Sequence, residues 1–71
     1  MLKIELCRIE DSNDFAVPSE YDVEGVRIES IIIDNNTLSE DSYTMIGPRK
    51  VDITHRVPDE VLVYAEISGV E

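Results

Sequence analysis

The clearest pattern along the chain is an alternation of apolar and polar residues with a period of two. It occurs in residues 2–9, 50–54 and 61–67, and residues 43–46 repeat it over a shorter stretch. Successive side chains of a β-strand point to opposite faces of a sheet, so this period predicts half-buried strands. No segment shows a convincing helical period, apart from a single turn near residues 38–41.

The segment from Gly25 to Asp34 starts with the same alternation and then loses it. Val26 and Ile28 alternate with charged residues, whereas Ile31–Ile33 is a continuous run of isoleucines. β-Branched residues disfavour a helix and suit a strand. The break in phase therefore predicts a strand that is buried on both faces, or a β-bulge that shifts the register by one residue.

Segments rich in turn-forming residues separate the predicted strands. Gly, Pro, Asn and Asp favour turns because each supports a backbone conformation or a local hydrogen bond that regular strands do not use. These segments are residues 10–14, Asn35–Asn36, Gly47–Pro48 and Pro58–Glu60. Leu38, in the connection that follows the two asparagines, is expected to pack back on the sheet.

The first 25 residues combine the first predicted strand with a more polar segment. The apolar run Phe15–Val17 stops at Pro18, which cannot donate a hydrogen bond to a sheet. This run is therefore predicted to form an edge strand or an extended contact segment. Residues 18–25 are acidic, and they are expected either to form a mobile arm or to pack on the domain through Tyr21 and Val23.

Together these patterns predict a single all-β domain over residues 1–71. The expected fold is a small antiparallel β-sandwich or a partly open barrel of about five to seven strands. It comprises an N-terminal strand with an acidic arm (1–25), an antiparallel core (26–67) and a tail (68–71). A domain of this size buries only about 60% of its unfolded surface, so it often depends on a partner for stability.

The charge of the chain narrows the range of partners. There are 16 acidic and 6 basic residues, which gives a formal net charge of −10, and the excess lies towards the two ends. Such a chain repels nucleic acid and anionic membranes and attracts basic surfaces, although acidity also serves solubility alone. No apolar run reaches the length of a signal peptide or a membrane span. The protein is therefore expected to be made and used in a cytosol, or in a particle assembled there.

The sequence offers no recognisable catalytic, cofactor or metal site. Cys7 is the only cysteine and His55 the only histidine, which excludes a disulfide within the chain and argues against a dedicated metal site. His55 lies in a predicted turn next to Arg56 and is expected to be an exposed loop residue rather than a catalytic base. The three glycines are far apart, so no phosphate-binding loop is present. We expect a protein that is not an enzyme and that uses no cofactor.

Several apolar side chains are predicted to serve a protein interface. The last predicted strand is apolar on both faces, and only one of these faces can cover the core of so small a domain. Leu62 and Tyr64 occupy the second face. The full set of predicted interface residues is Phe15, Val17, Tyr21, Ile32, Leu62 and Tyr64. The chain is therefore expected to form a dimer or trimer, or to attach to a larger protein.

The order of elements in residues 30–67 resembles that of small β-sandwich structural proteins of bacteriophage virions. The segments that carry the resemblance are Ile31–Asp34, Asn35–Asn36, Tyr43–Ile46, Gly47, Val51–Ile53, Pro58–Glu60 and Val61–Tyr64. The chain departs from the usual pattern at Asn36, where a glycine is common. The resemblance implies a capsid decoration (cement) protein that is synthesised in the cytoplasm of a host bacterium. Such a protein binds the major capsid protein in many copies and stabilises the virion, without contacting nucleic acid or membrane.

Three other functions are compatible with the same sequence. One is an acidic mimic of nucleic acid that inhibits a bacterial DNA-binding protein, and another is an accessory subunit of a phage tail or fibre. The third is an adhesion module from a larger chain. A mimic needs carboxylates along one ridge, whereas a decoration protein needs an apolar attachment face. The apolar double faces at residues 30–34 and 61–67 favour the decoration protein.

Overall fold

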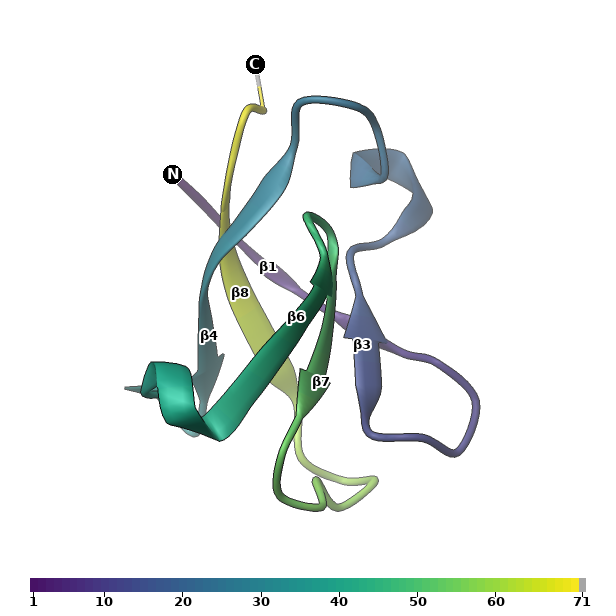
Figure 1. The fold of residues 1–71 in the computed structure, drawn as a ribbon, viewed down its shortest axis with the longest axis vertical. Helices are drawn as coiled ribbons and strands as arrows, with labels where there is room; N and C mark the ends of the chain where they lie inside the picture. The colour runs from purple at the N-terminus through teal and green to yellow at the C-terminus, as the bar shows by residue number, and fades with distance from the viewer. Residues whose placement is uncertain (71) are drawn as a thin grey trace.

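The computed structural model describes residues 1–70 and contains two antiparallel sheets of four strands each (Figure 1). The strands are β1 (Leu2–Glu5), β2 (Cys7–Arg8), β3 (Asp14–Ala16), β4 (Arg27–Ile33), β5 (Asn36–Thr37), β6 (Tyr43–Gly47), β7 (Lys50–Ile53) and β8 (Val63–Ser68). Two 3-10 helices of one turn each, η1 (Ser19–Tyr21) and η2 (Glu40–Ser42), lie between them. The prediction of an all-β antiparallel fold is confirmed. The structure has eight strands where five to seven were expected, because the predicted strand 2–9 is divided into β1 and β2 and because β5, with two residues, is too short for a period of two to reveal it.

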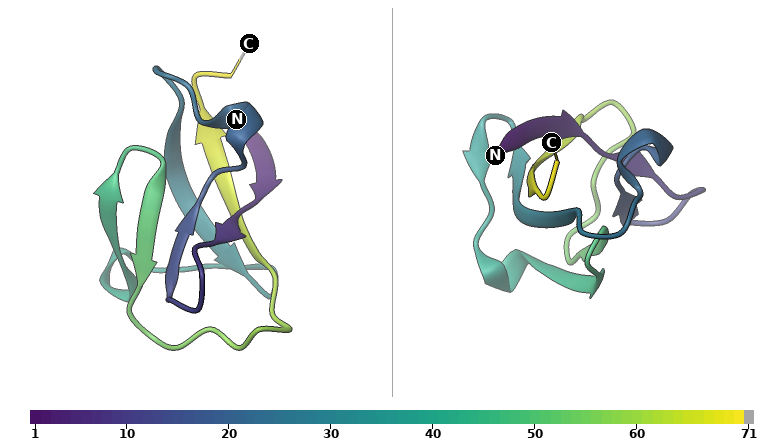
Figure 2. Two further views of the ribbon diagram at one scale, coloured as in Figure 1. Left: turned by 90° about the vertical axis from the view of Figure 1, so that its right-hand side faces the viewer. Right: turned by 90° about the horizontal axis from the view of Figure 1, so that it is seen from above.

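The two sheets face each other and are joined along one side. The strand order is β1-β8-β4-β5 in the first, which we call the β8 sheet, and β2-β3-β7-β6 in the second, the β7 sheet. β1 and β2 are parts of one extended run that passes from the β8 sheet to the β7 sheet at Leu6 (Figure 2). At this crossing the Leu6 amide donates to the Val63 carbonyl oxygen at 2.8 Å. The shared strand closes one side of the sandwich.

The core fills the space between the sheets and uses the predicted alternation. Ile31, Val51, Ala65 and Ile67 are fully buried there. The core consists of Ile4, Leu6, Phe15, Val17, Val26, Ile28, Ile31, Val51, Ile53, Val57, Val63, Ala65 and Ile67. In β7 and β8 every second residue belongs to this set, as the sequence predicts.

Phe15 and Val17 were expected at a protein interface, and the structure corrects this. Their exposed fractions are 3% and 5%, so both belong to the domain's own core. β3 is also not an edge strand, because β2 pairs with it on one side and β7 on the other. Pro18 follows the end of β3 and so does not interrupt its hydrogen bonds.

The isoleucine run in β4 combines both predicted alternatives. The register against β8 shifts between Ile28 and Ser30, which identifies a bulge at Glu29. Beyond the bulge Ile31 is in the core, whereas Ile32 lies opposite Tyr64 and outside the core cluster. The bulge thus turns Ile32 to the outer face of the β8 sheet, where it is 9% exposed.

The acidic segment of residues 18–25 packs on the domain. Tyr21 packs against the core, while Val23 is 53% exposed and does not act as an anchor. Arg49 donates from Nε to Asp22 Oδ1 at 2.8 Å and from Nη1 to the Val26 carbonyl oxygen at 3.1 Å. These contacts tie the segment to the turn between β6 and β7.

Candidate binding sites

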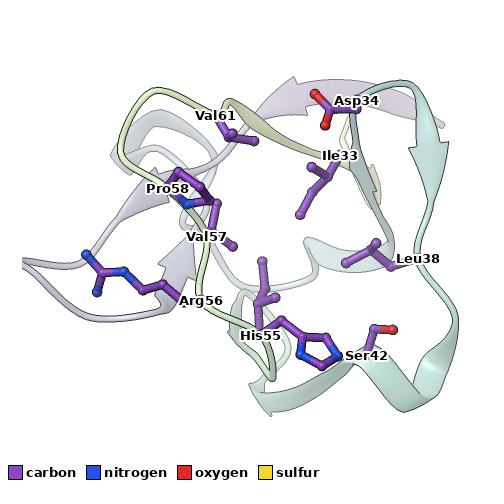
Figure 3. Close-up of a pocket in the computed structure, with 10 residues that line it drawn as sticks. Ile33, Asp34, Leu38, Ser42, His55, Arg56, Val57, Pro58 and Val61 are labelled. Carbon is purple, nitrogen blue, oxygen red and sulfur yellow. The ribbon is translucent and has the colours of Figure 1, made fainter.

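An apolar pocket of about 310 Å³ opens at the end of the sandwich where residues 54–62 cross between the sheets (Figure 3). Half-buried Ile33, Leu38 and Val61 pack against the core at this end, together with buried Ile53 and Val57. The packing of Leu38 confirms its predicted place. The remaining residues form the rim of the pocket, and all but one of them are polar. They are Asp34, Ser42, His55, Arg56 and Pro58.

The loop that forms this rim is held by Asn13, from the turn between β2 and β3. The Asn13 side-chain amide donates to the carbonyl oxygens of Ile53 and His55. Its Oδ1 accepts a hydrogen bond from the Val57 amide at 2.9 Å. One side chain therefore satisfies three backbone groups of a loop about forty residues away in the sequence, as the backbone of a part-buried loop requires.

Arg8, in β2, also binds the backbone of this loop. Its guanidinium donates to the carbonyl oxygens of Ser12 at 2.9 Å and of Val57 at 2.6 Å. It also lies over the buried Phe15 ring, 4.7 Å from the ring centroid, in a cation–π contact. Arg8 thus joins the core, the turn before β3 and the pocket loop. Arg8 follows Leu2, Ile4 and Leu6 in the apolar phase of the alternation, which agrees with its place over Phe15, but the sequence did not indicate its backbone partners.

The rim of the pocket offers polar groups without an activated nucleophile. His55 and Ser42 lie towards the same side of the mouth, whereas Arg56 points away from it (Figure 3). Within residues 1–70 the His55 ring makes no hydrogen bond, and Ser42 Oγ lies 3.3 Å from Ser39 Oγ. Activation of a serine requires a base in hydrogen-bond contact with it. The described residues do not show that contact.

The outer face of the β8 sheet brings together three of the predicted interface residues. Leu62 is 53% exposed, and with Tyr64 it lines a shallow hollow of about 310 Å³ beside the β4–β5 turn. Ile32 pairs with Tyr64 across the sheet, and Lys3 Nζ lies 5.2 Å from the centroid of the Tyr64 ring. We call Ile32, Leu62 and Tyr64 the outer apolar face. Tyr21 packs elsewhere, against the core.

The outer face of the β7 sheet carries a pair of aspartates. Asp14 and Asp52 lie directly opposite each other on β3 and β7. Partial desolvation, followed by hydrogen bonding and charge repulsion from Asp14, raises the pKa of Asp52. Among residues 1–70, no three His, Cys, Asp or Glu side chains come together in a group able to hold a metal ion. Neither helix described here has the length and apolar character needed to span a membrane.

Comparison of the chain with protein-family models, with curated proteins and with solved structures gave no match. The functional interpretation therefore depends on the surfaces described above.

Proposed function

We propose that this chain is a non-enzymatic structural subunit that attaches to a larger protein assembly through its outer apolar face. The observation that carries the proposal is the exposure of Leu62, 53%, beside Tyr64 and Ile32 on the face of the sheet that does not cover the core. Tyrosine is enriched at protein interfaces, and the exposed leucine beside it adds apolar area that a partner can cover.

The surroundings of this face suit a binding site. Lys3 and Glu66 are on neighbouring strands, and Glu60 lines the same hollow as Leu62. Charged residues around an apolar centre form the polar rim that interfaces commonly have. Leu62 is 53% exposed, so burial of its remaining area contributes about 1–1.5 kcal/mol, which is useful to a small domain that binds in many copies.

We further propose that the assembly is a bacteriophage virion and that the chain is a capsid decoration (cement) protein. The resemblance of residues 30–67 to small virion proteins supports this proposal, as does the net charge of −10, which favours a basic binding surface. The partner is then the major capsid protein, and the protein is synthesised in the cytoplasm of the host bacterium before it joins the particle.

The distribution of acidic residues favours decoration over nucleic-acid mimicry. Glu66 lies on the outer face of the β8 sheet, and Asp14 and Asp52 lie on the outer face of the β7 sheet. Others are in η2, at Glu40 and Asp41. A mimic presents its carboxylates along one ridge, whereas these lie on both sheets and in a connection.

The experiment compares Leu62→Glu with Val23→Glu. Both side chains are 53% exposed and both changes add one negative charge, but only Leu62 is on the outer apolar face. Virus particles are purified from cells that make each variant, and the copy number of the chain per particle is measured by quantitative mass spectrometry. We expect Val23→Glu to match wild type and Leu62→Glu to fall by at least about tenfold, with thermal melting unchanged.

Two results would overturn parts of the proposal. If the wild-type chain is absent from purified particles, the virion assignment is wrong. If it is present and Leu62→Glu binds as well as Val23→Glu, attachment uses another face.

A further inference from the structure

Among residues 1–70, the free edge of β6 is the longest strand edge without a charged residue. β6 pairs only with β7, and its five residues, Tyr43–Gly47, include no charge. Met45 and Ile46 on this strand are 39% and 50% exposed. β6 lies at one side of the molecule with its outer edge uncovered (Figure 2). Proteins usually protect such an edge with charges, proline or a covering element, because it is a template for another strand.

The register of β6 shows which backbone groups are free. The Thr54 amide donates to the Ser42 carbonyl oxygen at 2.9 Å, and Thr44 lies opposite Asp52. Residues of an antiparallel strand alternate between the two neighbouring sides in their hydrogen bonding. The backbone groups of Thr44 therefore point to β7, and those of Tyr43 and Met45 point outward from the sheet.

We propose that β6 pairs antiparallel with β6 of a second copy of this chain, which joins the two β7 sheets into one continuous sheet across a two-fold axis. An antiparallel pair of identical strands is self-complementary, as a two-fold interface requires. The register against β7 shifts between Met45 and Gly47, so Gly47 faces Lys50 across the turn. With Thr44 at the axis, Tyr43 lies opposite the partner's Met45, and the outward amides and carbonyls of these two residues satisfy each other.

The charges at the two ends of β6 are complementary in this arrangement. Glu40 and Asp41 precede the strand in η2, and Arg49 and Lys50 follow it. Antiparallel pairing places the acidic start of one β6 near the basic end of the other. Lys50 makes no salt bridge within residues 1–70, whereas Arg49 already binds Asp22. Lys50 is therefore the cation available to the partner's Glu40.

These charges also explain why a second copy would select this edge. Each copy has a net charge of −10, so most approaches bring acidic surfaces together. At about 0.15 M salt, charges farther apart than about 8 Å are largely screened, and the local pairs at the strand ends decide the outcome. This inference does not depend on the proposed function, because the outer apolar face belongs to the other sheet.

The test exchanges the charges at the two ends of β6. Glu40→Lys and Lys50→Glu each place like charges at both ends of the paired strands. Sedimentation velocity at about 0.15 M salt is expected to show a wild-type dimer and at least about tenfold weaker dimerisation of each variant alone. An equimolar mixture of the two variants restores both opposite-charge contacts, so it is expected to form a heterodimer. Glu20→Lys, with the same change in net charge as Glu40→Lys but in η1, is expected to dimerise at least as well as wild type.

Hydrogen exchange provides a second measurement that does not rely on variants. The amides of Tyr43 and Met45 are expected to exchange more slowly as protein concentration rises, while the Val23 amide is unaffected. A wild-type chain that remains monomeric up to about 1 mM would overturn the inference. A dimer that both charge variants retain, or one that Leu62→Glu abolishes and Glu40→Lys does not, would also overturn it.

Discussion

Gly25 and Gly69, two glycines with positive φ, meet where β4 begins and β8 ends. Their φ angles are +97° and +84°, in a region that residues with a Cβ adopt only with strain. They differ in their surroundings. A Cβ at Gly69 would overlap the backbone carbonyl of Gly25, whereas a Cβ at Gly25 would meet no atom within 4 Å.

The two glycines therefore form a matched pair for measurement. Gly25→Ala is expected to lower the free energy of unfolding by about 1–2 kcal/mol, through backbone strain alone. Gly69→Ala adds an overlap with backbone and is expected to cost about 2–5 kcal/mol, a large part of the stability of a small domain. Urea denaturation of both variants measures the difference. Equal costs would mean that Gly69 is not in close contact with Gly25.

Asp52 and Glu29 are two exposed carboxyl groups whose pKa values move in opposite directions. Partial desolvation and its neighbour Asp14 raise the pKa of Asp52. Hydrogen bonds from Ser68 and Arg27 lower the pKa of Glu29. A raised carboxyl pKa means that ionisation disfavours the folded state, and a lowered one means that ionisation favours it.

The effect of neutralising each group is therefore expected to differ in sign. Asp52→Asn should raise the melting temperature at pH 7, and this gain should shrink as pH falls through the raised pKa of Asp52. Glu29→Gln should lower the melting temperature at pH values above the unfolded-state pKa of about 4.3. This loss should fade as pH falls through the lowered pKa of Glu29. Thermal melts between about pH 3 and pH 7 test this. A stabilising effect of Glu29→Gln at pH 7 would contradict it.

At the scale of elements, the turn between β2 and β3 and the loop between β7 and β8 act as one unit through Asn13. The Asn13 side chain bonds the backbone of Ile53, at the end of β7, and of His55 and Val57, in the loop that borders the pocket. A part-buried backbone group that loses its partner costs more than the bond itself contributes. The shape of the pocket therefore depends on a side chain from the turn between β2 and β3.

Asn13→Ala is expected to lower the free energy of unfolding by about 1–3 kcal/mol and to speed hydrogen exchange at the Val57 amide. The control is Asn36→Ala, at an exposed asparagine whose only side-chain bond is to the Asp34 carbonyl oxygen at 3.2 Å. Asn36→Ala should change the free energy of unfolding by no more than about 0.5 kcal/mol. If the Val57 amide keeps its protection in Asn13→Ala, another group holds the loop.

At the scale of the whole molecule, the two proposed contact surfaces lie on different sheets. The outer apolar face is on the β8 sheet, and the free edge of β6 is on the β7 sheet. A dimer through β6 would present two copies of the attachment face, and two linked sites bind more tightly than one when the geometry allows both to engage.

Because the two proposed surfaces are separate, we expect that each can be disrupted without destroying the other. Leu62→Glu is expected to lose particle binding and to remain a dimer, whereas Glu40→Lys is expected to become a monomer that still binds, more weakly. Sedimentation and particle copy number, measured on the same two proteins, test this. A variant that loses both activities while it stays folded would show that the surfaces are coupled.

Local alternation of apolar and polar residues was enough to predict the all-β class and the longer strands, because a period of two is a property of neighbouring residues. Residues 50–53 and 63–67 bury every second side chain, as their alternation predicts. It also identified Leu62 and Tyr64 as apolar residues on a second face. Leu62 stays 53% exposed and Tyr64 half-buried because this segment has more apolar residues than one core can cover.

Only the tertiary structure decided which strand is an edge and which residues meet across the sandwich. Phe15 and Val17 became core because β2 and β7 flank β3, a pairing that the sequence of β3 does not encode. The contacts of Asn13 with Val57 and of Arg49 with Asp22 join residues far apart in the chain. Such contacts depend on the order of strands in the sheets, and that order is set by how all the apolar faces are buried together.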